Sequence, residues 1–577
     1  MDKEHLEHLR HSTAHLLAAA VMELYPGTRR TIGPAIEEGF YYDFEFLKPI
    51  SETDLPAIEE KMHAILKTWE GFERRKATAT EVRDLFCDNP YKLELIDQIV
   101  SDKQPITLYQ SGDYIDLCRG GHVKNPQKEM GHFKLLSLAG AYWRGDERNP
   151  MLTRIYGTAF PTKGDLDAYL LMMEEAKQRD HRKLGVELDL FTFSPLVGPG
   201  LPLFTPKGAT IRRLLERFVW SLMKPFGYER VDIPHMAKAE LYKTSGHWDK
   251  FSDDIFHISS KKTSEAFVMK PMNCPHHTQI YASRPRSYRD LPIRYSEVTK
   301  VYRDENTGQL QGLSRVRSIT QDDAHVFCTP DQILDEARNI YKIIQGFYGR
   351  FHMPLEAHLS ISGPAAPEKY LGAREVWERA EGILRDLLKE FGLPYEEAVG
   401  EAAFYGPKID FIARDAIGRK WQLATIQLDF NQPERFGLEY TDTDGEKKRP
   451  VMIHRAISGS LERFMAILIE HYAGAFPLWL APVQVVLVSV GERHEEFVRA
   501  LAQEWRKAGV RVDIDVSSEK IGGKVRKAAM QKVPWTIVVG DKEVAGGDFQ
   551  VKVFGSDKPL AISAQEAVSK ILSARSV

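Results

Sequence analysis

The 577-residue sequence is poor in cysteine and carries almost no net charge. Its four cysteines are too few for a disulfide framework in a chain of this size, so we expect a reducing compartment, the cytoplasm. Lysine plus arginine number 78 and aspartate plus glutamate 81, so the formal charge is −3 and no global cationic field indicates a nucleic-acid partner. Any contact with RNA must therefore come from local patches.

Long apolar runs and phosphate-binding loops are also missing. The first ten residues mix charges and are followed by no apolar signal segment. The most apolar window, residues 473–490, is interrupted by Pro477, Pro482 and Gln484, which favours a linker entering a buried strand over a membrane span. We expect no membrane partner. No glycine-rich loop of the P-loop or dinucleotide type precedes a helix, so a nucleotide would have to be held by side chains.

The length and the 43% hydrophobic content predict several globular domains. Residues 1–160 combine an amphipathic helix (HSTAHLLAAAVMEL) with short β-type runs, as in a compact α+β unit, and residues 161–185 have the pattern of a linker helix. Residues 186–476 place aromatic and β-branched runs between helices, which predicts a mainly antiparallel sheet and the catalytic body. Residues 477–577 alternate strand and helix, as in a small α/β domain with a parallel sheet.

One group of histidine and cysteine residues lies in the amino-terminal part. His11 and His15 are four residues apart and therefore on one helical face, and Cys118 and His122 follow far downstream in DLCRGGH. Taken alone, either pair is about as often two ordinary polar residues on a surface helix or loop as it is part of a functional site. Two matched pairs in one domain favour convergence of the four side chains.

A second group is scattered over the central block. Cys274, His325 and His454 are all residues that bind zinc, although scatter of this kind is weak evidence by itself. Three ligands leave an open coordination position, which distinguishes a catalytic or substrate-binding zinc from a closed structural site. His276 and His277 complicate the choice of ligand beside Cys274.

Three arginines lie in segments that we interpret as strand, strand and helix: Arg303, Arg315 and Arg463. Planar guanidinium groups bind phosphate through two hydrogen bonds at once. A surface salt bridge is the commoner role of any single arginine, so the arginines alone do not define a phosphate site.

These residues lie in segments that resemble the class II aminoacyl-tRNA synthetases. VYRDENTG, with Arg303 and Glu305, resembles motif 2 of that class, GSLERF with Arg463 resembles motif 3, and FGYERVDIPHM with Pro234 resembles motif 1. MNCP, GLSRVRSITQDDAHVF, FYGPKID, TIQLDF and VMIHRAISGSLERF are similar to threonyl-tRNA synthetases rather than to prolyl, seryl or histidyl relatives. HSTAH with CRGGH resembles that family's editing domain, and the residues from about 478 resemble its anticodon-binding domain.

The resemblance covers nearly the whole chain and implies a multidomain α+β fold. It implies an editing domain over 1–160, a linker helix over 161–185, a class II antiparallel-sheet catalytic domain over 186–476 and an α/β anticodon-binding domain over 477–577. The implied enzyme is a threonine–tRNA ligase, which activates threonine with ATP, transfers it from threonyl-adenylate to the 3′ end of tRNA(Thr), and hydrolyses mischarged seryl-tRNA(Thr). One zinc ion per chain, magnesium with the ATP and a homodimer are implied as well.

The resemblance also implies roles for individual residues. The implied zinc ligands are Cys274, His325 and His454. The implied ATP-binding residues are Arg303, Glu305, Arg315, Gln422 and Arg463, with Arg303 at the α-phosphate and Arg463 at the γ-phosphate. The implied threonine-binding residues are Gln321, Asp323, Tyr405 and Gln427. The implied editing residues are His11, His15, Lys92, Asp116, Cys118 and His122, and the implied anticodon-binding residues are Glu543, Lys532 and Lys552.

Several positions depart from the family's pattern. His276 stands where the family usually has glycine, and Ile319 replaces a phenylalanine that usually stacks on adenine. Lys532 and Lys552 stand where arginines often read the anticodon, and lysine cannot form a bidentate fork. Only ten residues precede His11, so we expect a form without the amino-terminal ubiquitin-like domain of many members.

Two alternative functions follow from these departures. The chain could be a duplicate or inhibitor-resistant synthetase paralogue, marked by His276 and Ile319. It could also be a non-catalytic regulator that uses the synthetase fold to bind RNA. Intact Arg303, Glu305 and Arg463 argue against the regulator, because a binding module has no need of phosphate-binding arginines.

The expected chemistry explains why one protein would need two sites. An apolar pocket rejects valine in favour of threonine poorly, by on the order of a hundredfold, whereas a zinc ion can accept both the amino nitrogen and the hydroxyl oxygen of threonine. Serine has both groups and lacks only a methyl, which is worth roughly 1 to 3 kcal/mol. Serine is therefore mischarged, and a separate hydrolytic site is the remedy.

Overall fold

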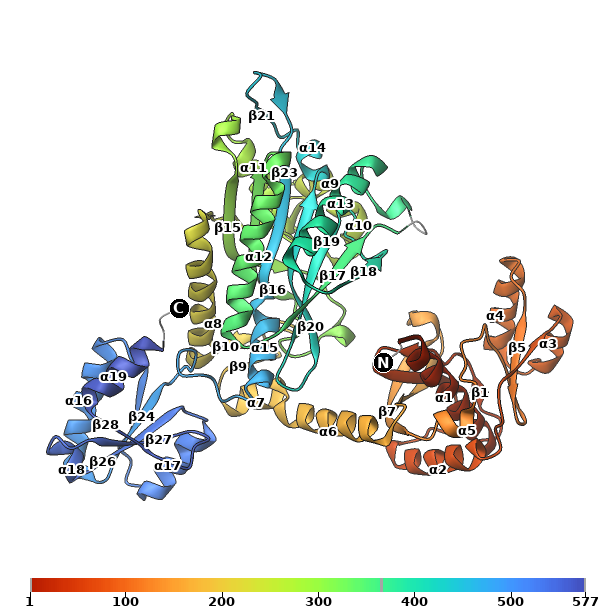
Figure 1. The fold of residues 1–577 in the computed structure, drawn as a ribbon, viewed down its shortest axis with the longest axis horizontal. Coiled ribbons are helices and arrows are strands. Elements are labelled where there is room, and N and C mark those ends of the chain that lie inside the picture. The colour runs from red at the N-terminus through yellow and green to blue at the C-terminus, as the bar shows by residue number, and fades with distance from the viewer. Residues whose placement is uncertain (1–2, 364–366, 575–577) are drawn as a thin grey trace. The chain divides into compact units, whose positions relative to one another are not determined.

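The structure is a computed structural model that describes residues 3–363 and 367–574. The chain divides into two compact units, residues 1–174 and residues 175–577 (Figure 1). Within the described residues no helix has both the length and the hydrophobicity that crossing a membrane requires. All four cysteines are free thiols.

The first unit is built around one long helix, α1 (Lys3–Leu24). This helix packs on strands β3 (Gly39–Glu45) and β8 (Met151–Ala159) and on helix α2 (Leu55–Leu66). The sequence predicts an amphipathic helix here, but α1 is buried almost continuously from residue 9 to residue 21. Sheet and helix enclose it from two sides, so little of α1 is left for solvent. The other strands of this sheet are β1 (Arg29–Arg30), β2 (Ala35–Ile36) and β7 (Phe133–Tyr142), in the order β1-β3-β8-β7 with β2 beside β3.

A smaller antiparallel sheet, β4-β5-β6, completes the first unit. Its strands are β4 (Glu73–Lys76), β5 (Thr107–Ser111) and β6 (Tyr114–Leu117), and the accompanying helices are α3 (Ala79–Leu85), α4 (Pro90–Ser101) and α5 (Pro126–Glu129). Helix α4 begins at Asn89, whose side chain accepts a hydrogen bond from the backbone N–H of Lys92, and Pro90 occupies its first position. This cap fixes the turn that carries Lys92.

Two helices follow the strands of the first unit, and the first of them crosses the boundary between the units at residue 174. Helix α6 (Lys163–Arg179) is basic at its end, and α7 (His181–Glu187) begins after Asp180, whose side chain accepts a hydrogen bond from the backbone N–H of Arg182. The segment expected to be one linker helix is thus a pair of helices.

The second unit contains a mainly antiparallel eight-stranded sheet, in the order β11-β15-β16-β23-β20-β19-β17-β18. Its strands are β11 (Glu229–Arg230), β15 (Ile293–Tyr302), β16 (Ser318–Cys328), β17 (Leu355–Ile361), β18 (Tyr395–Val399), β19 (Lys408–Arg414), β20 (Lys420–Asp429) and β23 (Val451–Ser460). The predicted antiparallel sheet is confirmed for the six inner strands, while each edge strand pairs in parallel. Helices α8 (Pro206–Met223), α12 (Ile333–Arg350), α13 (Arg374–Phe391) and α15 (Leu461–His471) pack against this sheet or one another (Figure 1).

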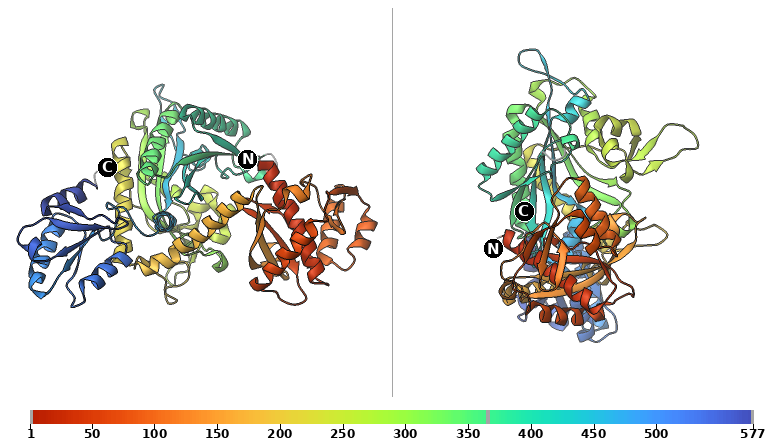
Figure 2. Two further views of the ribbon diagram at one scale, coloured as in Figure 1. Left: turned by 60° about the horizontal axis from the view of Figure 1, so that its bottom comes forward. Right: turned by 90° about the vertical axis from the view of Figure 1, so that its right-hand side faces the viewer.

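A small lobe lies beside the eight-stranded sheet (Figure 2). It consists of the antiparallel strands β12 (Met236–Lys238), β13 (His257–Ile258) and β14 (Phe267–Met269) with helices α9 (Ala239–Ser245) and α10 (His247–Phe251). Helices α11 (Cys274–Ala282) and α14 (Asn431–Arg435) connect this lobe to the sheet. The short strand pairs β9 (Phe191–Thr192) with β10 (Leu203–Phe204) and β21 (Tyr440–Thr441) with β22 (Lys447–Lys448) complete this part.

The carboxyl-terminal sheet corrects one prediction. The sequence predicts a parallel sheet, but the structure has a mixed one in the order β25-β24-β26-β27-β28, in which the last two strands are antiparallel. The strands are β24 (Val485–Ser489), β25 (Val512–Asp515), β26 (Trp535–Val539), β27 (Phe549–Val553) and β28 (Leu560–Ile562), and the helices are α16 (Glu495–Lys507), α17 (Ile521–Met530), α18 (Asp541–Val544) and α19 (Ala564–Ser573). The alternation of strands and helices does not predict β27 and β28 because no helix separates these two strands.

Candidate functional site

The central metal-binding candidate is assembled by strand register. His325 on β16 and His454 on β23 are paired residues, and Gln427 on β20 is the next residue in the same row. Cys274 is the first residue of α11 and reaches the same point. One ligand atom from each of Cys274, His325 and His454 lies within 4.8 Å of the others, and all three side chains are buried.

Hydrogen bonds behind the two histidines orient their rings. His454 Nε2 lies 2.8 Å from Asp429 Oδ2, so this nitrogen donates and Nδ1 keeps its lone pair. His325 Nδ1 lies 2.8 Å from His277 Nδ1, which leaves His325 Nε2 as the free nitrogen. Outer hydrogen bonds of this kind commonly hold metal-binding imidazoles in place. Glu297 Oε2 is 3.9 Å from His277 Nε2 and extends the arrangement outward.

Burial favours the uncharged forms of His325 and Cys274. It lowers the pKa of His325 well below its usual value, and it raises the pKa of the Cys274 thiol well above its usual value. Neutral imidazoles are the form that binds metal, and a coordinated cation would convert the thiol to thiolate. The two nitrogens and one sulfur fit zinc, and the open side remains for substrate.

Polar residues surround the open side of this cluster. Asp323 Oδ2 accepts a hydrogen bond from Asn273 Nδ2 at 3.0 Å, and Gln321 Oε1 lies 3.5 Å from the same nitrogen. Tyr405 is buried with its ring centroid 5.1 Å from that of His454, and Gln427 donates from Nε2 to the Gly406 carbonyl at 3.3 Å. The structure thus gathers the four expected threonine-binding residues around the candidate metal centre.

Two arginines of the second unit, Arg303 and Arg463, have no anionic partner among the described residues. Arg303 follows β15, and its Nη2 lies 3.1 Å from Met272 Sδ. Arg463 lies in α15, 5.9 Å from the centroid of the Trp421 ring, and burial lowers its pKa. Within the described part of the chain, no carboxylate lies at ion-pair distance from either guanidinium group. A half-buried guanidinium group without a counter-ion is free to bind an anionic ligand such as phosphate.

Arg315 behaves differently. Arg303 and Arg315 both lie in the loop between β15 and β16. The prediction that each of these two arginines lies in a strand is therefore wrong. Arg315 Nη2 is paired with Glu305 Oε2 at 2.6 Å, and its side chain is about half exposed (48%). Gln422 is exposed on β20. The turn residues of ENTGQLQG interrupt the β pattern that the arginines on either side suggest.

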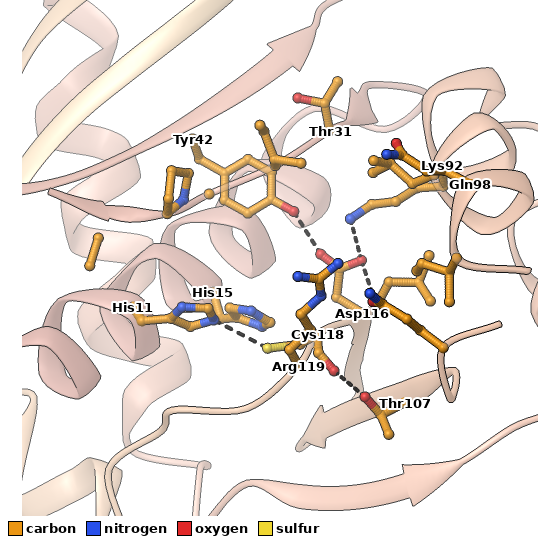
Figure 3. A pocket seen from close by; sticks show the side chains of 18 of the residues that line it. His11, His15, Thr31, Tyr42, Lys92, Gln98, Thr107, Asp116, Cys118 and Arg119 are labelled. Atoms are coloured by element: carbon orange, nitrogen blue, oxygen red, sulfur yellow. Dashed lines mark hydrogen bonds and ion pairs between the residues drawn. The ribbon is translucent and has the colours of Figure 1, made fainter. Parts of the chain in front are cut away.

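The amino-terminal cluster brings all four predicted residues together. Cys118 Sγ lies 3.2 Å from both His11 Nε2 and His122 Nε2, and His15 stacks on His11 with centroids 5.1 Å apart. The two histidines on α1 point toward Cys118 (Figure 3). One ligand atom from each of these four side chains lies within 4.8 Å of the other three. Cys118 thus bonds to His11 and His122, while the ring of His15 packs against the rings of both.

A buried charge network adjoins this cluster. Lys92 Nζ lies 2.6 Å from Asp116 Oδ1, and the hydroxyls of Tyr42 and Tyr114 donate to Asp116 Oδ2 at 2.6 and 2.9 Å (Figure 3). Burial alone would raise the pKa of Asp116, but the charges of Lys92 and Arg30 outweigh it and lower that pKa well below its usual value. Asp116 is therefore a stable carboxylate that fixes the lysine.

The histidines of the amino-terminal cluster are neutral near pH 7. Burial lowers the pKa of His11 to about 4, of His15 to about 3 and of His122 to about 2. Burial raises the pKa of the Cys118 thiol to about 11. His11, His15 and Cys118 line a cavity of about 660 Å³ together with Lys92 and Asp116. A neutral imidazole beside a cavity can accept a proton from water.

The expected anticodon-binding residues lie in three elements of the carboxyl-terminal part. Glu543 is in α18 and accepts a hydrogen bond from the Gly540 backbone at 2.9 Å, and Lys552 is exposed on β27. Lys532 precedes β26 and donates to the Ala473 carbonyl. No hydrogen bond or ion pair joins the three side chains to one another in residues 3–363 and 367–574.

The chain matches three known domain families. Residues 256–472 match the tRNA synthetase class II core domain (G, H, P, S and T), and residues 484–574 match the anticodon binding domain. Residues 106–156 match the second additional domain of threonyl and alanyl tRNA synthetases. The antiparallel sheet and these matches together define a class II aminoacyl-tRNA synthetase fold with an editing-type and an anticodon-binding domain.

Relatives that align with nearly the whole chain identify the particular synthetase family. The chain is 51% identical over 552 residues to the threonine–tRNA ligase of Rubrobacter xylanophilus, which covers 95% of this chain and 86% of the relative. It is 49% identical over 567 residues to that of Staphylococcus carnosus, covering 98% and 87%. A crystal structure described as the RNA binding domain of threonyl-tRNA synthetase from Cryptosporidium parvum superposes with a TM-score of 0.66 at 34% identity, covering 68% of this chain and 98% of that one. The chain belongs to the threonine–tRNA ligase family.

Several residues around the two clusters were not predicted. Asp429 and His277 orient the central histidines, and the buried His247 places Nε2 3.8 Å from Cys274 Sγ. In the amino-terminal cluster, Ser12 Oγ lies 3.1 Å from His122 Nδ1, and Arg30 completes the charge around Asp116. Ser12 lies inside HSTAH, Asp429 inside TIQLDF and His277 three residues after Cys274, and these positions were the available signals. The others come from strands and helices whose pairing the sequence does not display.

Proposed function

We propose that this chain attaches threonine to tRNA(Thr) at the expense of ATP and removes serine attached in error. The observation that carries the proposal is the three-donor cluster of Cys274, His325 and His454, with Asp323 beside it. Arg303 and Arg463, which have no carboxylate partner among the described residues, lie in the same unit. Membership of the threonine–tRNA ligase family supports the same activity.

One zinc ion per chain would be held by Cys274, His325 and His454. Bound zinc would supply coordination for the amino nitrogen and the hydroxyl oxygen of threonine. The protein's own contribution is orientation, since Asp429 and His277 fix the two imidazole rings. Asp323 can accept a hydrogen bond from the threonine amino or hydroxyl group, and valine would leave this carboxylate unsatisfied.

Threonine activation requires positioning more than it requires a protein nucleophile. The threonine carboxylate attacks the α-phosphorus of ATP, a new carboxyl–phosphate bond forms, and pyrophosphate leaves. Arg303 would stabilise charge on the α-phosphate and Arg463 charge on the γ-phosphate, with magnesium on the outer oxygens. Glu305, Arg315 and Gln422 would complete the ATP site, and Gln321, Tyr405 and Gln427 the threonine site.

Proofreading would take place in the amino-terminal cavity. His11, His15, Cys118 and His122 together can hold a water molecule against a seryl ester, and Lys92, held by Asp116, adds a positive charge near the developing oxyanion. The cavity of about 660 Å³ is large enough for the terminal adenosine of a tRNA with its amino acid.

The remaining parts of the assembly are proposed on family membership. Residues 1–160 would form the editing domain, 161–185 the linker, 186–476 the catalytic domain and 477–577 the anticodon-binding domain, with Glu543, Lys532 and Lys552 reading tRNA. A homodimer formed through the motif 1 segment and a cytoplasmic location belong to the same proposal.

Threonine-dependent exchange between ATP and pyrophosphate tests the proposal. We expect exchange in the wild type, and we expect Arg303→Ala and Arg463→Ala each to reduce it by a hundredfold or more, on the order of the effect of removing one transition-state donor. Arg374→Ala is the matched control, since that arginine is 87% exposed and pairs only with Glu378. If the wild type shows no exchange, the chain is better explained as an RNA-binding regulator. If either variant shows near-normal exchange, ATP binds elsewhere than at that arginine.

A paralogue that resists an inhibitor would retain all these activities. The side chain of His276 is buried with both ring nitrogens unpaired within the described structure, and Ile319 lies on β16 at the edge of the candidate ATP site. Comparing inhibition of the wild type with that of His276→Gly and Ile319→Phe distinguishes this alternative from an ordinary member.

A further inference from the structure

The loop that carries Arg303 and Arg315 is held at its tip by a histidine from another part of the chain. This loop, residues 303–317, connects β15 to β16. At its tip, the backbone N–H of Leu313 donates to His181 Nε2 at 3.1 Å. The Leu313 side chain is fully buried in the core of the second unit. His181 is the first residue of α7 and is itself 3% exposed.

The imidazole of His181 is fixed on its other side by a carboxylate. Glu470, near the end of α15, places Oε1 2.6 Å from His181 Nδ1 and 3.1 Å from the His181 backbone nitrogen. Its second oxygen is paired with Arg419 at 2.6 Å. Burial alone would raise the pKa of Glu470, but the hydrogen bonds from His181 and the charge of Arg419 lower it overall. Glu470 is therefore an acceptor, so Nδ1 carries the proton.

These contacts determine the tautomer of His181. Because Nδ1–H donates to Glu470, Nε2 has a free lone pair, and the N–H of Leu313 can only donate. His181 thus connects α15 to the loop through one hydrogen bond at each ring nitrogen. Asp180, His181 and Glu470 have the residue types of a metal site, but both ring nitrogens are already hydrogen-bonded and Asp180 is paired with Arg182.

The loop is shaped to accept this contact. Gly312 has φ +51°, and a Cβ at this position would lie 2.4 Å from His181 Nε2. Glycine is therefore required by both backbone conformation and the close approach. On either side of the tip, the loop is held by a hydrogen bond from Arg317 N to Gly200 O at 2.8 Å and by the pairing of Glu305 with Arg315.

We propose that His181 is a positioning residue for the ATP site: the relay from Glu470 through His181 to the Leu313 amide holds residues 303–317 in the conformation that presents Arg303, Glu305 and Arg315 to ATP. The inference deepens the proposed function and rests on it. His181 itself touches neither ATP nor threonine. Since α7 begins one residue after α6, the loop is held by the segment that directly follows the linker helix.

Two substitutions of His181 separate its two hydrogen bonds. His181→Asn places an amide near the position of Nδ1, so it can still donate to Glu470, but no atom reaches Leu313. His181→Gln places an amide oxygen near the position of Nε2 and restores an acceptor. We expect Asn to raise the KM for ATP about tenfold, as for the loss of one buried hydrogen bond, with the KM for threonine within about twofold of wild type. We expect the KM for ATP of His181→Gln to return most of the way to the wild-type value.

Hydrogen–deuterium exchange of the full chain gives a readout that does not depend on activity. The peptide containing Leu313 should be protected in the wild type, lose protection in His181→Asn and regain it in His181→Gln. Asp180→Ala is the matched control, because it removes the cap of α7 and leaves the contact to Leu313 in place. Gly312→Ala tests the same contact from the loop side, and its effect on the KM for ATP should not add to that of His181→Asn.

The outcomes distinguish this inference from the proposed function. Wild type without threonine-dependent exchange would overturn the proposed function, while the exchange of the Leu313 peptide would still report on the relay. An active wild type with unchanged ATP KM and unchanged protection in His181→Asn would overturn the inference. Lost protection with an unchanged KM would also overturn it, since the contact would then not position the ATP site.

Discussion

The two histidine–cysteine clusters use the same donor types in different surroundings. In the central cluster each histidine bonds to a group behind it, His454 to Asp429 and His325 to His277, so the free lone pairs face one another. In the amino-terminal cluster Cys118 Sγ lies 3.2 Å from both His11 Nε2 and His122 Nε2, so three of the four donors share hydrogen bonds with each other. The first cluster is backed by a sheet, and the second borders a cavity of about 660 Å³.

The difference shows that the surroundings of donor groups, more than the donors themselves, determine what a cluster can do. Lone pairs that are oriented from behind and converge on one point suit a cation. Donors that share hydrogen bonds beside a cavity, next to a fixed lysine, suit a water molecule and an ester. The central cluster therefore fits recognition through zinc, and the amino-terminal one fits hydrolysis.

The largest expected effect comes from removing the central thiol. Cys274→Ser should lose the bound zinc and reduce threonine-dependent pyrophosphate exchange by about a thousandfold or more, because a site built around a substrate hydroxyl then lacks its partner. Elemental analysis of wild type and variant measures the metal. Deacylation of preformed seryl-tRNA is the control and should not change. Equal zinc in both proteins would contradict the assignment of the cluster.

A reciprocal effect is expected from the amino-terminal cluster. His11→Ala combined with His15→Ala should slow deacylation of seryl-tRNA about a hundredfold, within the usual range for general base catalysis, and leave threonine activation intact. The measurement is single-turnover deacylation beside pyrophosphate exchange. Unchanged deacylation would exclude these histidines from the mechanism. Loss of both activities would mean that the two sites are less independent than the comparison implies.

Sequence reasoning reached the members of both clusters but not their surroundings. Spacing placed His11 and His15 on one helical face, and α1 confirms that helix. His325 and His454 were candidates by residue type and were assigned to zinc by the family resemblance. Their pairing depends on strand register between segments more than a hundred residues apart. Register is set by packing across the whole sheet, so the orienting role of Asp429 could not be read from its neighbours in sequence.

The same limit applies to the fold. The inner strands of the large sheet were predictable because their β-branched and aromatic residues form long runs. The burial of α1 on two sides was not, since it results from a sheet and a helix contributed by distant segments. The antiparallel strands β27 and β28 were missed because one side of the carboxyl-terminal sheet departs from strict alternation with helices.

Two adjacent histidines sharpen the comparison at a smaller scale. His277→Ala removes the group that orients His325 and should weaken zinc binding about tenfold, at the lower end of such effects. His276→Ala is the matched control, because that ring has no hydrogen-bond partner in the described structure. Competition with a chelator measures both affinities. Equal weakening by the two variants would show that packing beside Cys274, and not ring orientation, holds the metal.

The last expected effect concerns the pH dependence of stability in the first unit. His11 and His15 stay neutral in the folded state, with pKa values of about 4 and about 3, whereas unfolded histidine binds a proton near pH 6.5. The unfolded state therefore binds more protons below pH 6.5, so stability is full above that pH and falls on acidification toward pH 4. The slope is about 1.4 kcal/mol per pH unit for each such histidine.

Urea unfolding of the full chain between pH 7 and pH 5, followed by hydrogen exchange in α1, measures this slope. The double variant His11→Ala with His15→Ala should have a shallower slope than wild type, because two of the groups that resist protonation are gone. Asp116 does not interfere in this range, since its lowered pKa makes its own contribution fade only below about pH 4. Equal slopes in the two proteins would mean that folding does not lower the pKa of these histidines. The imidazoles would then become charged on mild acidification, and the buried neutral base that distinguishes the amino-terminal site from the central one would be contradicted.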